Sequence, residues 1–172
     1  KLSNGEQVPE LQDFISEVMK AGSCTRLWLD IKNITSPKTL TDYPINACKR
    51  ACEIITEMKA QNFVEFICTG NQTVMAKSNE YARAAGVEIG WMGNQPASVY
   101  QQKSYTWANL STTYMSQGGG ERTIDEFTKA DIAISVFNAD DDATMNYYIS
   151  KAKQMKAICT NYPKKLINKM KK

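Results

Sequence analysis

Hydrophobic positions along the chain alternate between two spacings. Near the N-terminus, five apolar residues follow the i, i+3, i+4, i+7, i+8 spacing of an amphipathic helix, with Gly22 suited to end it: Leu11, Phe14, Ile15, Val18 and Met19. The run that follows, 27–31, is short and mostly apolar, which is typical of a strand buried on both faces of a sheet. The pattern therefore predicts a helix followed by a strand.

The same alternation recurs to the C-terminus. We expect further strands over 63–68, 87–91, 106–110, 132–137 and 157–160. We expect helices over 46–60, 74–85 and 123–129, after Pro96, after the Asp140–Asp142 cap and after Pro163. Pro37 and Pro44 indicate a loop, and residues 116–121 a glycine-rich loop. Six strands alternating with helices predict an α/β fold with a parallel sheet.

The number of units leaves two architectures open, an open doubly wound sheet and a barrel. A complete TIM (β/α)8 barrel has eight units in about 250 residues. Six units in 172 residues are two short of it, and the chain opens on a helix, as if midway through a unit. The length suits one domain, covering 1–172.

Composition is that of an ordinary soluble globular protein, with 42% hydrophobic and 23% charged residues. No apolar run approaches the roughly 20 residues that span a bilayer, so we expect no transmembrane segment. Because the first residue is Lys1 and not methionine, the compartment stays open between the cytoplasm and the periplasm or exterior.

The last nine residues are basic and contain five lysines: Lys164, Lys165, Lys169, Lys171 and Lys172. Such a tail can bind nucleic acid or acidic lipid, or it can be a solvated helix with cations at its negative end. No arginine accompanies the lysines, as nucleic-acid binding would favour. We therefore favour the solvated helix and expect no nucleic-acid partner.

The chain has no histidine, which excludes imidazole acid–base chemistry from its own residues. Its five cysteines are an odd number at irregular spacing, a poor disulfide framework: Cys24, Cys48, Cys52, Cys68 and Cys159. Cys48 and Cys52 share one helix face and could join a metal site, but we favour small buried side chains. The glycine run 118–120 could bind phosphate through backbone N–H groups, but we favour a flexible connection.

The clearest candidate site is the end of the first strand. Asp30 and Lys32 are two apart, so their side chains point to the same face. A carboxylate beside an ammonium suits a divalent cation and a phosphate oxygen. A partly buried ion pair that only stabilises the strand end is equally consistent with this spacing.

Four segments together resemble the glycerophosphodiester phosphodiesterase family of TIM barrels. Gly5–Leu11 is similar to that family's Gly-x-x-Ile-Pro-Thr-Leu-Glu segment, and Leu27–Lys32 to its apolar run ending in Glu-x-Lys. The stretch from Ile134 through Asn138, with Asp141 and Met145, resembles its Val-x-Val-Trp-Thr-Val-Asn-Asp segment. Thr160–Pro163 resembles its terminal Thr-Asp-x-Pro. The four segments occur in the family's order over essentially the whole chain.

The resemblance implies an incomplete TIM barrel that hydrolyses glycerophosphodiesters with a divalent cation, Mg²⁺ or Ca²⁺. It assigns metal binding to Asp30 and phosphate contact, with a catalytic role, to Lys32. Aromatic side chains could then line the side that receives the alcohol group, or simply belong to the core: Trp91, Trp107 and Phe137.

Two departures and one absence qualify the resemblance. Asp30 replaces a glutamate, and Phe137 replaces a tryptophan. The family's catalytic histidines and its other metal carboxylates belong to the first two strands, upstream of Lys1. We therefore expect the chain alone to be inactive and to need the preceding segment as a partner. The alternative is a non-catalytic or degenerate α/β module with a structural Asp30–Lys32 pair.

Overall fold

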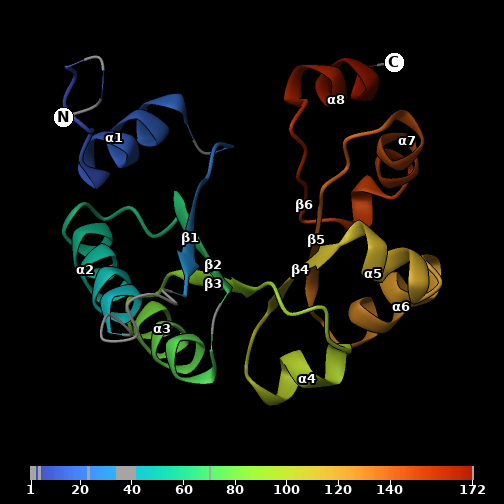
Figure 1. Ribbon diagram of the computed structural model, residues 1–172, viewed down its shortest axis with the longest axis horizontal. Coiled ribbons are helices and arrows are strands. Elements are labelled where there is room, and N and C mark those ends of the chain that lie inside the picture. Colours follow the sequence, from blue (N-terminus) through green and yellow to red (C-terminus); the bar gives the residue numbers. More distant parts are fainter. Residues whose placement is uncertain (1–2, 4, 23, 34–41, 70, 172) are drawn as a thin grey trace. The chain divides into compact units, whose positions relative to one another are not determined.

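The computed structural model describes residues 3, 5–22, 24–33, 42–69 and 71–171 (Figure 1). Six strands are present: β1 (Leu27–Lys32), β2 (Val64–Thr69), β3 (Glu88–Trp91), β4 (Trp107–Ser111), β5 (Ala133–Phe137) and β6 (Ala157–Ile158). The helices are α1 (Leu11–Ala21), α2 (Tyr43–Glu57), α3 (Gln72–Ala84), α4 (Ala97–Gln102), α5 (Thr112–Gln117), α6 (Glu121–Lys129), α7 (Asp142–Ser150) and α8 (Pro163–Met170), with a 3₁₀ turn, η2 (Ala152–Gln154).

The strands follow one another in the sheet in chain order, β1 to β6. The paired strands run parallel, with Leu27 opposite Val64 in the first pair and Trp107 opposite Ala133 in a later one. A doubly wound sheet reverses its strand order at a switch point, whereas a β/α barrel keeps chain order throughout. The predicted parallel α/β fold is confirmed, and the strand order favours the barrel type.

The chain divides into two compact units, residues 1–89 and residues 90–172. In the first unit, α2 and α3 pack side by side against the β1–β2 pair (Figure 1). Its core includes Ile55 and Phe66 together with three cysteines that are buried as expected: Cys48, Cys52 and Cys68. Cys24, by contrast, is exposed.

The second unit contains β4, β5 and β6 with the end of β3, surrounded by α4 to α8. Its largest fully buried side chains are Trp107, Tyr100 and Phe127. Tyr100 of α4 packs edge-on against Phe127 of α6, with ring centroids 5.5 Å apart. Among the described residues, no helix is long and apolar enough to cross a membrane.

Three details differ from the sequence expectations. The first strand is not buried on both faces: only Ile31 is buried, because β1 ends the sheet and pairs with β2 alone. Helix α2 begins at Tyr43, with Pro44 inside its first turn and not in a loop. Helix α5 was not expected; it follows β4 directly, and the Ser111 side chain accepts a hydrogen bond from Tyr114 N at 3.1 Å.

The glycine run after α5 is a helix end and the start of the next helix. The N–H groups of Gly118, Gly119 and Gly120 donate to carbonyls of α5 at 2.9 to 3.2 Å. Gly119 and Gly120 have φ of 85° and 51°, conformations that favour glycine. Because all three N–H groups are engaged, the run is not free to hold a phosphate.

Candidate functional site

Asp30 and Lys32 lie on the face of β1 that points away from the helices. Ile31 is buried, and it is in register with Cys68, whose buried thiol interacts with Ser78 of α3 and Cys48 of α2. Asp30 and Lys32 therefore project from the opposite face, where Lys32 Nζ donates to Asp30 Oδ2. Their side chains remain 38% and 65% exposed. The structure brings the two candidate residues together as an accessible ion pair.

A second acid lies on the same face, closer to the start of the strands. Glu65 of β2 is in register with Trp28, and Trp28 Nε1 donates to its Oε2 at 2.7 Å. Arg26 Nε lies 3.8 Å from Glu65 Oε1. Glu65 is not among the candidate residues predicted from the sequence. The feature that could have identified it is a charged residue inside the apolar run 63–68. Its side chain is buried and paired, so it stabilises the strand pair rather than extending the open site.

Asparagines close the carboxyl end of this strand pair. Asn71 Nδ2 donates to Asn33 Oδ1 at 3.3 Å, which joins the residues that follow β1 and β2. Asn71 also caps α3, since its side chain accepts from Val74 N at 3.0 Å. Lys32 is in register with Thr69, two residues before Asn71. The exposed ion pair therefore lies at the carboxyl end of the strand pair, near the hydroxyl of Thr69 and the amide groups of Asn33 and Asn71.

The described residues do not by themselves form a metal site. No group of three histidine, cysteine, aspartate or glutamate side chains within the described ranges is arranged to hold an ion. Asp30 provides one carboxylate, and one of its oxygens already accepts from Lys32. Protein-bound Mg²⁺ or Ca²⁺ needs several oxygen ligands. Asp30 can contribute one ligand of a set, and the others would have to come from outside these residues.

Two of the three candidate aromatic residues are in the core of the second unit. Trp91 is 9% exposed and packs on Tyr100 and Tyr105, with ring centroids 4.8 and 5.7 Å away. Trp107 is fully buried. Phe137, the last residue of β5, keeps partial exposure. A role for all three beside the alcohol group stays a prediction, and the burial of both indoles weighs against it.

The polar groups around Trp107 satisfy one another. Trp107 Nε1 donates to Ser135 Oγ at 2.8 Å, and Ser135 Oγ lies 2.9 Å from Asn109 Oδ1. Lys156 Nζ stands 4.9 Å from the centre of the Trp107 ring. A Cβ at Gly90 would meet this ring at 2.5 Å, so only glycine fits opposite it. The second unit thus has a buried, hydrogen-bonded network around Trp107, with the Lys156 ammonium over the indole ring.

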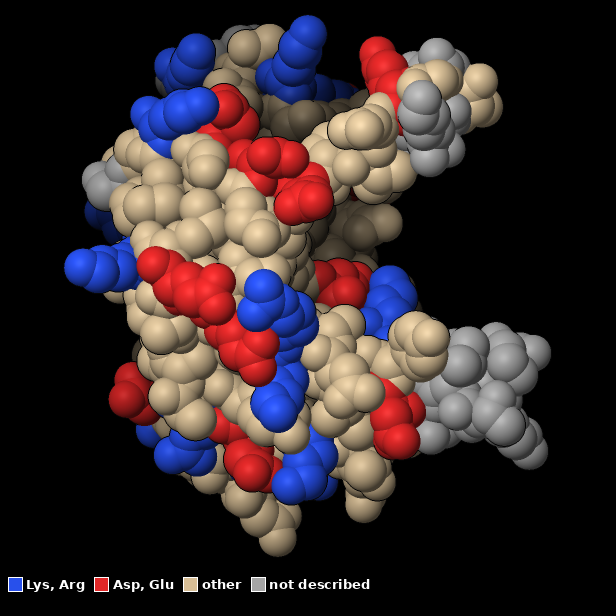
Figure 2. All heavy atoms as spheres, turned by 90° about the vertical axis from the view of Figure 1, so that its left-hand side faces the viewer, with Lys and Arg blue, Asp and Glu red and all other residues tan. Residues whose placement is uncertain are grey.

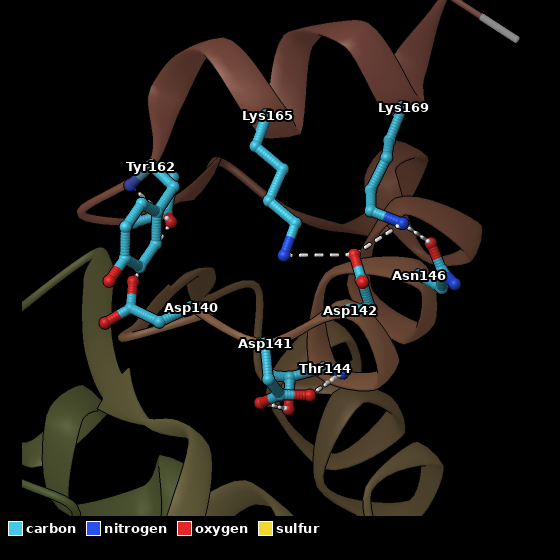
Figure 3. Close-up of polar contacts among 9 residues, drawn as sticks. Asp140, Asp141, Asp142, Thr144, Asn146, Tyr162, Lys165 and Lys169 are labelled. Atoms are coloured by element: carbon cyan, nitrogen blue, oxygen red, sulfur yellow. Dashed lines mark hydrogen bonds and ion pairs between the residues drawn. The ribbon is translucent and has the colours of Figure 1, made fainter.

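Three consecutive aspartates after β5 have three different roles (Figure 3). The sequence predicts that all three cap a helix. In the structure only Asp141 caps α7, because its side chain accepts a hydrogen bond from Thr144 N at 2.9 Å. Asp140 accepts from Asn161 N at 2.8 Å and Thr160 Oγ1 at 3.0 Å. These hydrogen bonds lower the pKa of Asp140, with the Asn161 backbone the largest cause. Asp140 therefore connects the ends of β5 and β6.

Asp142 joins α7 to the C-terminal helix. Its Oδ1 lies 2.8 Å from Lys169 Nζ and 3.2 Å from Lys165 Nζ (Figure 3). The hydrogen bond from Lys169, followed by that from Lys165, lowers the pKa of the Asp142 carboxyl. Two of the five terminal lysines thus face the protein, a feature that their position in the tail does not reveal.

Basic and acidic side chains lie next to one another over the face shown in Figure 2. In the first unit, ion pairs of this kind run along the helices, such as Lys20–Glu17 at 2.7 Å on α1 and Lys77–Glu80 at 2.8 Å on α3. A nucleic-acid surface would instead gather basic groups on one side. The charge on this face is typical of a solvated exterior.

No protein-family model matches the chain, and no curated protein matches it. Solved structures do. A glycerophosphodiester phosphodiesterase from Parabacteroides distasonis matches 99% of this chain at 16% identity with a TM-score of 0.78. A protein from Silicibacter pomeroyi assigned as a glycerophosphoryl diester phosphodiesterase matches 94% at 10% identity, with a TM-score of 0.69. A glycerophosphodiester phosphodiesterase from Agrobacterium tumefaciens matches 91% at 12% identity, with a TM-score of 0.63.

The chain covers only part of each of these proteins: 67%, 57% and 60% of their lengths, in the same order. At these identities the likeness establishes the fold. Six parallel strands in chain order, alternating with helices, are the part of the barrel that the three proteins share with this chain. The chain therefore has the fold of the glycerophosphodiester phosphodiesterases, as an incomplete TIM barrel.

Proposed function

We propose that this chain is the C-terminal portion of a metal-dependent glycerophosphodiester phosphodiesterase, which releases glycerol phosphate and an alcohol. The observation that carries the proposal is the accessible Asp30–Lys32 pair at the carboxyl end of β1, in a chain with that family's fold. In β/α barrels the active site lies at this end of the strands.

Lys32 is the residue to which we assign the catalytic role. Its side chain is 65% exposed, and its ammonium group pairs with Asp30. A phosphodiester gains negative charge on its phosphoryl oxygens as it is hydrolysed, and a positioned cation stabilises that charge. Lys32 would contact one of these oxygens, and Asp30 would keep the ammonium oriented.

Asp30 would also serve as one ligand of the divalent cation, which polarises the phosphoryl oxygen when bound. The acid and the base of the reaction cannot be histidines of this chain, because it has none. We assign the histidines and the remaining metal carboxylates to a segment that precedes Lys1 in the complete protein. The chain alone is accordingly expected to be inactive.

Uncovered apolar surface supports the existence of such a segment. On α8, Leu166 is buried and Lys165 and Lys169 reach Asp142, whereas Ile167 and Met170 are 50% and 54% exposed. By helical periodicity, Ile167 and Met170 lie on the side away from Lys165 and Lys169. Contiguous exposed apolar surface is a feature of contact sites, so this side of α8 is where we propose that the segment binds.

The first helix shows the same feature, since Phe14 of α1 is 49% exposed. Strand β1 ends the sheet and pairs with β2 only, which leaves an edge that can take a further strand. We propose that the preceding segment covers both the α8 face and the β1 edge. The three comparison proteins are each longer than this chain by an amount that could provide it.

A second candidate function is a non-catalytic α/β module. The observation that favours it is that the Asp30 carboxylate is already paired with Lys32, with no second carboxylate beside it in the described residues. In that case Asp30 and Lys32 would only stabilise the strand end.

Hydrolysis assays on two proteins distinguish these candidates. The complete protein and the 172-residue chain are each incubated with glycerophosphoethanolamine, with Mg²⁺ or Ca²⁺ and then with a chelator. We expect the complete protein to release glycerol phosphate only with the cation, and the chain to release none. Absence of hydrolysis by the complete, folded protein under all conditions would support the non-catalytic module.

The covering segment is tested separately with a substitution on α8. Ile167→Asp in the complete protein should lower the melting temperature, because it introduces a charge into the proposed contact. Thr128→Asp, at an exposed position on α6, is the control and should have little effect. Equal melting temperatures for the two variants would contradict the proposed covering of α8.

A further inference from the structure

Where α5 follows β4 and α7 follows β5, the second unit has an open pocket of about 510 Å³. This volume is in the range of pockets that bind small molecules. Eight residues line it: Thr112, Thr113, Ser116, Gly120, Ala143, Thr144, Tyr147 and Tyr148. None of them belongs to the Asp30–Lys32 site.

The lining is rich in hydroxyl groups and has no charge. Six of the eight lining residues carry a hydroxyl, and the other two are Gly120 and Ala143. The acids adjacent in sequence to lining residues, Glu121 and Asp142, do not line the pocket and form ion pairs, Glu121 with Lys151 and Asp142 with two lysines of α8. A charged ligand would find no counter-ion in this lining, whereas a neutral ligand with several hydroxyl groups would find donors and acceptors.

Tyr148 forms part of the pocket wall. The residue is only 3% exposed, but its hydroxyl is not among the fully buried side-chain atoms that lack a hydrogen-bond partner within the described residues. Burial raises the pKa of Tyr148 to about 12, so the group remains a neutral donor at physiological pH. Because Tyr148 lines the pocket, a molecule bound there can contact its side chain.

Gly120 preserves the space beside the second tyrosine. Tyr147 and Tyr148 pack edge to face, with ring centroids 5.0 Å apart and an interplanar angle of 78°. A Cβ at Gly120 would stand 2.5 Å from the Tyr147 hydroxyl, and the φ of 51° at this position also favours glycine. The glycine run after α5 therefore leaves room for the Tyr147 hydroxyl at the pocket.

We propose that this pocket binds a neutral polyhydroxy compound of about monosaccharide size. The Tyr148 hydroxyl donates to the ligand, and the hydroxyl groups of Thr112, Thr113 and Tyr147 provide further donors and acceptors. The site uses no residue of the Asp30–Lys32 pair, so its test does not depend on the proposed hydrolysis.

The test is a titration of the isotope-labelled complete protein, followed by NMR. The probes are glucose and myo-inositol as neutral polyols, with choline as a cation and inorganic phosphate as an anion. We expect saturable shifts at pocket residues with at least one neutral polyol, in the millimolar range, and none with choline or phosphate. Binding of choline or phosphate at these residues, or no saturable shift up to tens of millimolar polyol, would overturn the proposal.

Two variants locate the binding. Tyr148→Phe removes only the hydroxyl and should weaken polyol binding about tenfold, the effect of one lost hydrogen bond. The melting temperature of the Tyr148→Phe protein should change little, because the substitution keeps the buried ring. Ala143→Met extends a side chain into the pocket and should also weaken binding, whereas Tyr81→Phe on α3 is the matched control. Unchanged affinity in both pocket variants would place the ligand elsewhere and refute the site.

Discussion

The strand pairs β1–β2 and β4–β5 each carry polar side chains, but these side chains differ in their exposure to solvent. On β4–β5, Trp107 and Ser135 are fully buried and hydrogen-bonded. On β1, Asp30 and Lys32 stay in contact with solvent. Neutral polar groups can be buried when they form hydrogen bonds with one another, whereas a buried charge requires several well-placed partners. The charged pair at the end of β1 is therefore the one that remains accessible to a substrate.

The largest effect expected from this comparison is at the buried network around Trp107. Trp107→Ala should destabilise the protein by about 3–5 kcal/mol, because it removes a fully buried indole and leaves a cavity beside Gly90. Chemical denaturation measures the free energy of unfolding. A loss below about 1 kcal/mol would show that the network is not part of the core.

A smaller loss is expected at the centre of the network. Ser135→Ala should cost about 1–3 kcal/mol, since it leaves the Trp107 N–H and the Asn109 carbonyl without their shared partner. Ser150→Ala is a suitable control, because Ser150 is an exposed serine that bonds only the carbonyl of Tyr147. Equal effects of the two substitutions in denaturant titrations would contradict the role assigned to burial.

Sequence reasoning located the strands and most helices because apolar spacing is a local property. It missed α5, since Thr112 and Thr113 continue a strand-like pattern and only the Ser111 cap starts the helix. The sequence predicted that β1 is buried on both faces. The apolar residues of β1 do not reveal that this strand ends the sheet.

The candidate site was only partly predictable. Asp30 and Lys32 could be paired from the two-residue period of a strand. The contacts of Asp142 with Lys165 and Lys169 could not, because they join residues more than twenty positions apart without any periodic signal. Burial of Trp91 and Trp107 likewise depends on tertiary packing, which no single strand pattern contains.

Acid should affect the second unit through its exposed aspartates. The pKa of Asp142 is lowered by Lys169 and Lys165, so the stability it contributes is present above its ordinary value of 3.8 and is lost as pH falls below it. The melting temperature should therefore fall on acidification. Asp142→Asn should show a lower melting temperature at neutral pH and a smaller further fall in acid. Parallel pH profiles for the two proteins would rule out this contribution.

The smallest stability effect is expected at the open site. Lys32→Ala should change the free energy of unfolding by no more than about 1 kcal/mol, because an exposed ion pair contributes little. Denaturant titration measures this, with Lys20→Ala as a control from another exposed pair, Lys20–Glu17. A large loss would mean that Asp30 and Lys32 are structural, and the contrast between the two strand pairs would disappear.

The most direct test is the hydrolysis rate of the complete protein carrying Lys32→Ala. Loss of a cation that stabilises the developing negative charge predicts a fall in kcat of about 10²–10³-fold, with the melting temperature unchanged. Lys20→Ala, on α1, should leave the rate as it was. Near-normal hydrolysis of a glycerophosphodiester by the Lys32→Ala protein would contradict the assignment of the active site to this end of β1.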